Sequence, residues 1–125
     1  MTPEEFKQRT KTFALRVIKL VQSLPRTSEG DVLGRQLLRS ATSVAANYRA
    51  ACRAKSVPDF ISKLGTVEEE SDESLLWMEL IADSGIMPIN RLQELMKESD
   101  EITAMTVASI NRSRSQLKKS KRPMP

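Results

Sequence analysis

The chain has 125 residues, of which 39% are hydrophobic and 29% are charged, a composition typical of neither disordered nor membrane proteins. Its length favours a single folded domain that buries about two-thirds of the surface of the unfolded chain. No apolar run approaches the roughly 18 residues of a membrane span, the N-terminus carries no export signal, and the one cysteine has no disulfide partner. We therefore expect a cytoplasmic protein without a membrane partner.

The net charge of +4 is distributed unevenly along the chain. Residues 1–55 carry a net charge of +7, residues 56–101 carry −9 and residues 102–125 carry +6. The fold therefore decides whether these blocks of charge neutralise one another or form separate surfaces.

The first predicted helix begins after Thr2, because Thr2, Pro3 and Glu5 have the order of an N-cap, a first-turn proline and a capping-box glutamate. Pro25 ends this helix, and residues 25–30 form a short connection. Its core stripe is Phe6, Thr10, Phe13, Val17, Leu20, Val21 and Leu24.

The second predicted helix begins somewhere between residues 28 and 31, runs to about residue 54 and carries three stripes at helical spacing. Beside its apolar stripe runs a row of small polar residues that would let another helix come close. Its arginines form two like-charged pairs, which repel unless acidic groups or an anionic ligand face them. The apolar stripe is Leu33, Leu37, Ala41, Val44, Tyr48 and Cys52, the polar row is Gln36, Ser40, Ser43 and Asn47, and the pairs are Arg35 with Arg39 and Arg49 with Arg53.

The third predicted helix starts at Ser56, which has the position of an N-cap before Pro58, and ends at Gly85. A fourth helix is expected from about Pro88 to Leu117, followed by a basic tail over residues 118–125 that we expect to be frayed and disordered. The core stripes are Phe60, Leu64, Val67, Ser71, Leu75, Met78 and Ile81 in the third helix, and Leu92, Leu95, Ser99, Ile102, Thr106, Ser109 and Ser113 in the fourth.

Four helices, three short connections and no strand signal predict one all-α domain, residues 1–117, folded as an antiparallel up-down-up-down four-helix bundle. In this topology the start of the first helix, the end of the second, the start of the third and the end of the fourth lie together. We call this the basic end. The cations expected there are Lys7, Arg9, Lys11, Arg49, Arg53, Lys55, Lys63, Arg112, Arg114, Lys118, Lys119, Lys121 and Arg122.

All of these cations except Arg9 and Lys63 are candidate nucleic-acid-binding residues, because lysine and arginine contacts to phosphate give binding that is independent of sequence and sensitive to salt. The alternative is that they are solubilising residues placed favourably at helix C-termini. No aromatic residues are interleaved with the cations, and no RNA-recognition motif is present, so the expected binding is non-specific.

Antiparallel pairing of the second and third helices about a turn near Ser56 predicts a second cluster of charges. Arg39 is expected opposite Glu73, Ser43 near Glu70, and Arg35 near Glu79. We interpret Arg35, Arg39, Glu70, Glu73 and Glu79 as a partly buried ion-pair network that fixes helix register or a subunit contact. The alternative is a site where these charges meet an incoming group.

Nothing in the sequence favours an enzyme or a cofactor. The acidic run over residues 68–73 lacks the histidine that a di-metal carboxylate bundle needs, so we expect no metal site. Cys52 has no histidine to activate it, and we interpret it as a small core residue. Trp77 is expected to be a core or interface anchor, although stacking on a base is an alternative.

Three runs, QLLRSATSVAANYRAA (36–51), DFISKL (59–64) and ESDESLLW (70–77), resemble bacterial four-helix bundle proteins encoded in intervening sequences of large-subunit ribosomal RNA genes. The resemblance covers about residues 6–113. It implies an antiparallel bundle that assembles as a ring-shaped homopentamer. A more distant resemblance is to the accessory variability proteins of diversity-generating retroelements, which associate with a reverse transcriptase and its RNA. The family name describes a genomic location and not an activity.

The function expected from the sequence is therefore a non-enzymatic oligomeric bundle whose basic end binds RNA or another nucleic acid, or docks an RNA-bearing complex. A reverse transcriptase is one protein partner that the resemblance implies. The alternative is a protein-interaction scaffold or accessory subunit without direct nucleic-acid binding.

Overall fold

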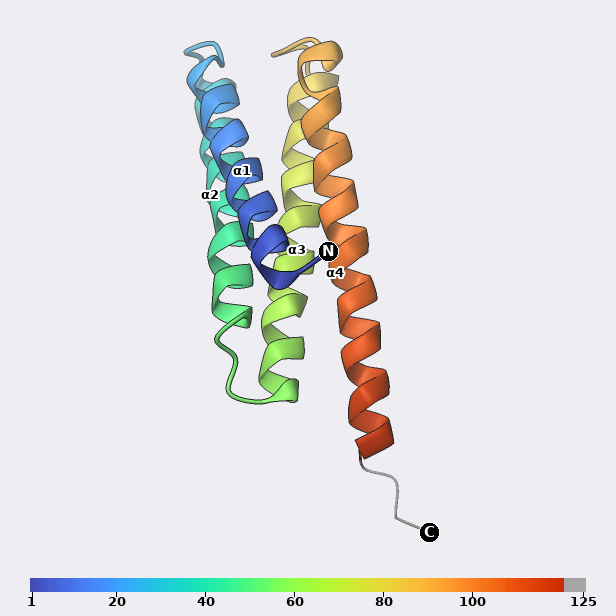
Figure 1. Cartoon of the computed structure of the whole chain (residues 1–125). Helices are drawn as coiled ribbons and strands as arrows, with labels where there is room; N and C mark the ends of the chain where they lie inside the picture. Colours follow the sequence, from blue (N-terminus) through green and yellow to red (C-terminus); the bar gives the residue numbers. More distant parts are fainter. Residues whose placement is uncertain (121–125) are drawn as a thin grey trace.

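The computed structural model describes residues 1–120 and consists of four helices packed side by side (Figure 1). They are α1 (Pro3–Gln22), α2 (Ser28–Ala51), α3 (Val57–Asp83) and α4 (Gln93–Ser120), with a short 3-10 turn, η1 (Ile89–Arg91), before α4. Each helix runs antiparallel to the one before it, which confirms the predicted all-helical bundle.

The start signals predicted for the first and third helices act where expected, and Thr27, which was not predicted as a cap, acts in the same way. The side-chain oxygens of Thr2, Thr27 and Ser56 accept hydrogen bonds from the backbone N–H groups three residues later, at 3.0 to 3.1 Å, and so cap α1, α2 and α3. Gly85 follows α3 with a φ of 78°, a left-handed conformation that glycine adopts without steric cost.

Three predicted boundaries are wrong. The second helix ends at Ala51 and not at residue 54, and the fourth begins at Gln93 because the 3-10 turn intervenes after Pro88. The helix α4 continues to Ser120, so residues 118–120 of the predicted tail are helical, because no proline or glycine interrupts residues 114–120.

The core lies along the bundle axis and is built from the predicted stripes. Phe13, Val17, Leu37, Leu64 and Ile102 are completely buried. Burial of each large apolar side chain contributes about 1.5 to 3 kcal/mol, so this core is the main source of stability. In α4 the buried residue is Ile110, whereas the neighbouring Ser109, which was predicted in the core stripe, is only half-buried.

Cys52 is exposed, contrary to its prediction as a core residue. It occupies the C-cap of α2, one residue beyond the last helical turn, where the chain leaves the bundle. The apolar spacing therefore continued past the point where the helix itself stopped.

Buried hydroxyl groups join α2 to α3 and α3 to α4. Ser40 of α2 and Ser74 of α3 are fully buried, and their Oγ atoms lie 2.8 Å apart. At the α3–α4 crossing the Ser99 hydroxyl donates to the backbone carbonyl of Ser71 at 2.5 Å, and the Ser71 hydroxyl lies 2.7 Å from that of Thr103. These small side chains let α2, α3 and α4 approach closely while their polar atoms stay hydrogen-bonded.

The first helix is staggered relative to the other three. Phe6 packs edge-to-face on Tyr48 near the end of α2, with ring centroids 4.6 Å apart. The residues before it line a cavity of about 420 Å³ together with Ala108 and Arg112 of α4. Since α4 continues to Ser120, its last two turns extend beyond the start of α1 (Figure 1).

Candidate nucleic-acid interface

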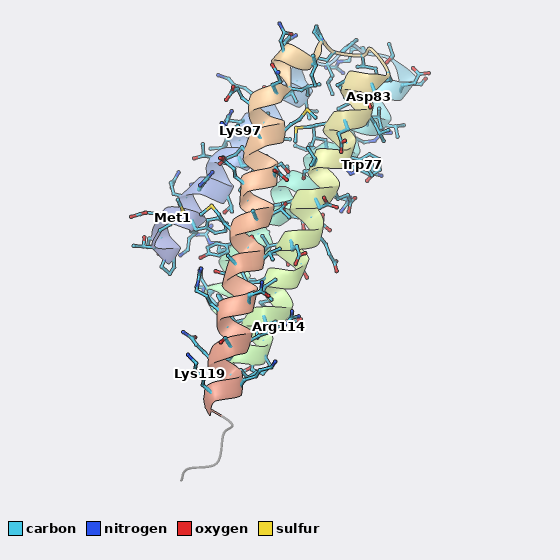
Figure 2. All side chains as sticks on the ribbon, turned by 90° about the vertical axis from the view of Figure 1, so that its right-hand side faces the viewer. Met1, Trp77, Asp83, Lys97, Arg114 and Lys119 are labelled. Atoms are coloured by element: carbon cyan, nitrogen blue, oxygen red, sulfur yellow. The ribbon has the colours of Figure 1, made fainter. Side chains whose placement is uncertain are left out.

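The basic end is formed by the last turn of α2, the connection to α3, and the last turns of α4, which all lie at one end of the bundle (Figure 1). Figure 2 shows Arg114 and Lys119 along the lower part of α4. Seven cations meet there and every one is exposed, so their charged groups are accessible to a polyanion. They are Arg49, Arg53, Lys55, Arg112, Arg114, Lys118 and Lys119.

These seven cations have little acidic compensation. Within residues 1–120 none of their side chains forms a salt bridge, and Arg112 donates instead to the Ser109 hydroxyl at 3.1 Å. Asp59 at the start of α3 is already engaged, because it accepts from the Lys63 ammonium at 2.6 Å and from the backbone N–H of Lys55 at 3.0 Å. The hydrogen bond from Lys63, followed by that from Lys55, lowers the pKa of Asp59.

Helix dipoles also act at this end. Both α2 and α4 end there, and the partial negative charge of a helix C-terminus favours nearby cations. Some of these cations therefore stabilise the helices themselves. This is expected if they are solubilising residues placed favourably at helix C-termini.

The start of α1 stands above the last turns of α4 (Figure 1), although its first residues line a cavity together with Arg112. Lys7 pairs with Glu4 at 3.0 Å. Lys11 follows Arg9 on α1, and Arg9 is level with acidic residues in the first turns of α4. Because α1 is staggered, Figure 2 shows its N-terminal Met1 well above Lys119. The two remaining predicted cations, Lys121 and Arg122, lie outside the described residues.

Arg9 was predicted at the basic end, but it joins α1 to the first turns of α4. Its Nε donates to Glu98 Oε2 at 2.8 Å and its Nη2 donates to Glu98 Oε1 at 2.7 Å, a bidentate pair, and Nη2 also lies 2.9 Å from Glu101 Oε2. The hydrogen bond from Arg9 lowers the pKa of Glu98, and the same bond raises the pKa of Arg9. Nothing in the sequence signals this pair. Arg9 and Glu98 are 89 residues apart, and no single turn sets the register of α1 against α4.

The predicted charge cluster between α2 and α3 is assembled only in part. The Arg39 guanidinium contacts the carboxylates of Glu70 and Glu73, and the Trp77 indole N–H donates to Glu73 at 3.2 Å. Ser43 accepts from Asn47 at 2.8 Å. Within the described part of the chain, Arg35 and Glu79 form no salt bridge and both are exposed.

The Arg39 cluster is expected to contribute little to stability. The Arg39 side chain is 50% exposed, so replacing it by alanine should cost only about 0.5 to 1 kcal/mol, well below the loss expected for a buried pair. Urea denaturation of Arg39→Ala measures this cost. Arg53→Ala is the control, because it removes another exposed arginine, one that forms no salt bridge within residues 1–120. A loss above about 3 kcal/mol for Arg39→Ala would contradict the expectation.

Comparison with known proteins shows which family the chain belongs to and a solved structure that it resembles. Residues 4–108 match the family model described as 23S rRNA-intervening sequence protein. The chain belongs to this family. A crystal structure of a protein of unknown function from the S23 ribosomal protein family of Bacteroides thetaiotaomicron is 31% identical, with a TM-score of 0.82 over 89% of this chain and 99% of that one. A comparison with curated proteins gives no significant match.

The match to the family model stops at residue 108, before the cations at the end of α4. Among residues 1–120, no cluster of three histidine, cysteine or acidic side chains is placed to hold a metal ion. No helix in that part of the chain has the length and apolarity needed to cross a bilayer.

Proposed function

We propose that this protein is a non-enzymatic homo-oligomer whose basic end binds RNA, or another nucleic acid, by neutralising phosphates. The observation that carries the proposal is the convergence of two helix ends and one connection, which places seven exposed cations without a salt bridge at one end of the bundle. Membership of a family named for ribosomal RNA intervening sequences supports an RNA partner. Binding of this kind needs no chemistry and little base recognition.

Assembly would strengthen such binding. If several copies present their basic ends on one side of a ring, a long polyanion can contact more than one copy, and the effective concentration of the second contact raises the overall affinity. The resemblance noted from the sequence implies a homopentamer. The expected mass is then about 70 kDa, five times the 14.1 kDa of one chain, by light scattering after size exclusion.

We expect RNA binding to fall steeply with salt and to depend on the cations of α4. Replacing Arg112, Arg114, Lys118 and Lys119 together by glutamine should reduce the affinity for a labelled single-stranded RNA by about 10- to 100-fold in 0.1 M salt. It should also reduce the slope of log K against log salt by up to about 3. Fluorescence anisotropy at several salt concentrations measures both changes.

A matched control separates local charge from net charge. Arg16, Lys19, Arg91 and Lys97 are exposed near the opposite end of the bundle, and their replacement by glutamine removes the same four charges. This control should keep at least about a third of the wild-type affinity, since long-range attraction is screened within about 10 Å at 0.1 M salt. Equal losses in the two variants would refute a localised site.

The alternative function is that of an accessory subunit that binds a protein, such as a reverse transcriptase, and touches no nucleic acid. The placement of cations at the C-terminal ends of α2 and α4, where they stabilise the helices, favours this alternative. Absence of salt-dependent RNA binding by the wild-type protein would select it.

A further inference from the structure

The outer face of α3 carries an apolar ridge surrounded by acids. Leu76 and Leu80 are 47% and 39% exposed, although they follow one another at the four-residue spacing of one helix face. No lysine or arginine occurs in α3 after Lys63. We call this surface the α3 ridge; its acidic members, all exposed, are Glu69, Asp72, Glu79 and Asp83. Figure 2 shows Asp83 projecting from the upper end of α3.

A groove with complementary character lies between α1 and α2. Ile18, Val21 and Leu38 are only partly buried there, and the groove has a volume of about 450 Å³. Gly34 lies buried in the lining, where an added Cβ would lie 3.0 Å from Leu24 Cδ1. Its charged margin contains Arg26, Arg35 and one acid, Asp31. We call this surface the α1–α2 groove. It is apolar in the middle and positive at its edge, whereas the α3 ridge is apolar in the middle and negative at its edge.

The ridge and the groove stand at the same height along the bundle. Ser40 of α2 lies opposite Ser74 of α3, and these helices are antiparallel. Counting away from that pair in both directions places Leu80 level with Gly34, Leu76 level with Leu38, and Glu79 level with Arg35. In a ring whose axis is parallel to the bundle, the rotation that relates two copies does not change the height of a residue along that axis. A contact between two different surfaces of neighbouring copies therefore requires both surfaces to lie at the same height.

We propose that the α3 ridge of one copy docks into the α1–α2 groove of the next copy, with Leu76 and Leu80 in the groove and Glu79 against Arg35. The inference rests on the proposed homo-oligomer and specifies its interface. A second copy is the occupant because the same chain supplies both surfaces, with opposite charge and equal height. The contact joins two different surfaces, so it propagates around a ring and leaves Arg49 and Arg53 of α2 free at the basic end.

The ridge is tested by Leu76→Asp with Leu80→Asp. Both side chains are exposed, so the monomer should keep its helical circular dichroism, while the mass by light scattering should fall from the oligomer to about 14 kDa. Glu94→Arg with Asp100→Arg changes two exposed acids on α4 and should leave the mass unchanged. A ridge variant that retains the wild-type mass would overturn the proposed interface and leave the proposed RNA binding intact.

The pairing of ridge with groove is tested by a charge swap. Arg35→Glu and Glu79→Arg should each raise the dissociation constant of the oligomer by about 10-fold or more, because each places like charges together. The two substitutions combined should restore assembly to within about threefold of wild type. Failure of the combination to restore assembly would refute the assigned contact, and a monomeric wild-type protein would refute both the contact and the proposed oligomer. RNA affinity and its salt slope are measured separately on each variant.

Discussion

Replacing Arg9 by methionine is expected to destabilise the protein by about 2 to 4 kcal/mol, which corresponds to a fall in melting temperature of about 6 to 15 °C. Arg9 is the bidentate partner of Glu98, and the two side chains are only 25% and 16% exposed. The substitution leaves Glu98 beside Glu101 without its cation. The α1–α4 interface is also the sparsest between neighbouring helices, so little other packing compensates for the loss.

The control for this prediction is Lys7→Met on the same helix. Lys7 pairs with Glu4, whose side chain is 82% exposed, so its loss should cost less than about 0.5 kcal/mol. Thermal unfolding of both variants measures the difference. Equal destabilisation by the two substitutions would show that Arg9 does not join the helices more strongly than a surface pair does.

The same pair predicts a dependence on pH. Arg9 lowers the pKa of Glu98 in the folded state, so the carboxylate contributes stability above its unfolded pKa, and this contribution is lost as the pH falls through the folded pKa. The stability difference between wild type and Arg9→Met should therefore be largest at neutral pH and shrink from about pH 5 downward. A difference that stays constant to pH 3 would contradict this origin.

Enlarging Ser40 to leucine is expected to have the second large effect, a loss of about 3 kcal/mol or more. Ser40 is fully buried at the α2–α3 crossing, where its hydroxyl meets that of Ser74 at 2.8 Å. A leucine there forces the helices apart and breaks this contact, whereas Ser40→Ala should cost only about 1 kcal/mol because Ser74 still donates to the Glu70 carbonyl.

Urea denaturation of the two Ser40 variants separates volume from hydrogen bonding. Thr42→Leu, on an exposed position of the same helix, controls for the effect of leucine on α2 and should change stability by less than about 0.5 kcal/mol. If Ser40→Leu and Ser40→Ala destabilise equally, the crossing is loosely packed and the close approach is not important for folding.

Most of the fold could be predicted because its determinants are local. Thr2, Ser56 and Gly85 act through hydrogen bonds or backbone conformation within a few residues, and the spacing of Leu37, Val44 and other apolar residues fixes which face of each helix is buried. The register of α2 against α3 also followed from their short connection, since Arg39 contacts Glu73 as counted.

The errors arose where distant packing decides the outcome. The height of α1 depends on how Phe6 packs against Tyr48, and no spacing within α1 reveals that contact. Arg9 consequently meets Glu98 and Glu101 of α4 and not the cations with which it was predicted to lie. Cys52 was wrongly predicted to be buried for a related reason. Periodicity identifies which face of a helix is buried, but it does not show where the helix ends.

Unequal helix lengths have a consequence for dynamics. After Ser113, no described residue of α4 is buried, and the last turns of α4 extend beyond the start of α1 (Figure 1). Amide hydrogens in these turns should therefore exchange with solvent through local fraying at a much lower free energy than those near Leu37 or Ile102. As a polyanion is added, amide exchange should slow in these turns at concentrations lower than those that raise the melting temperature of the whole protein.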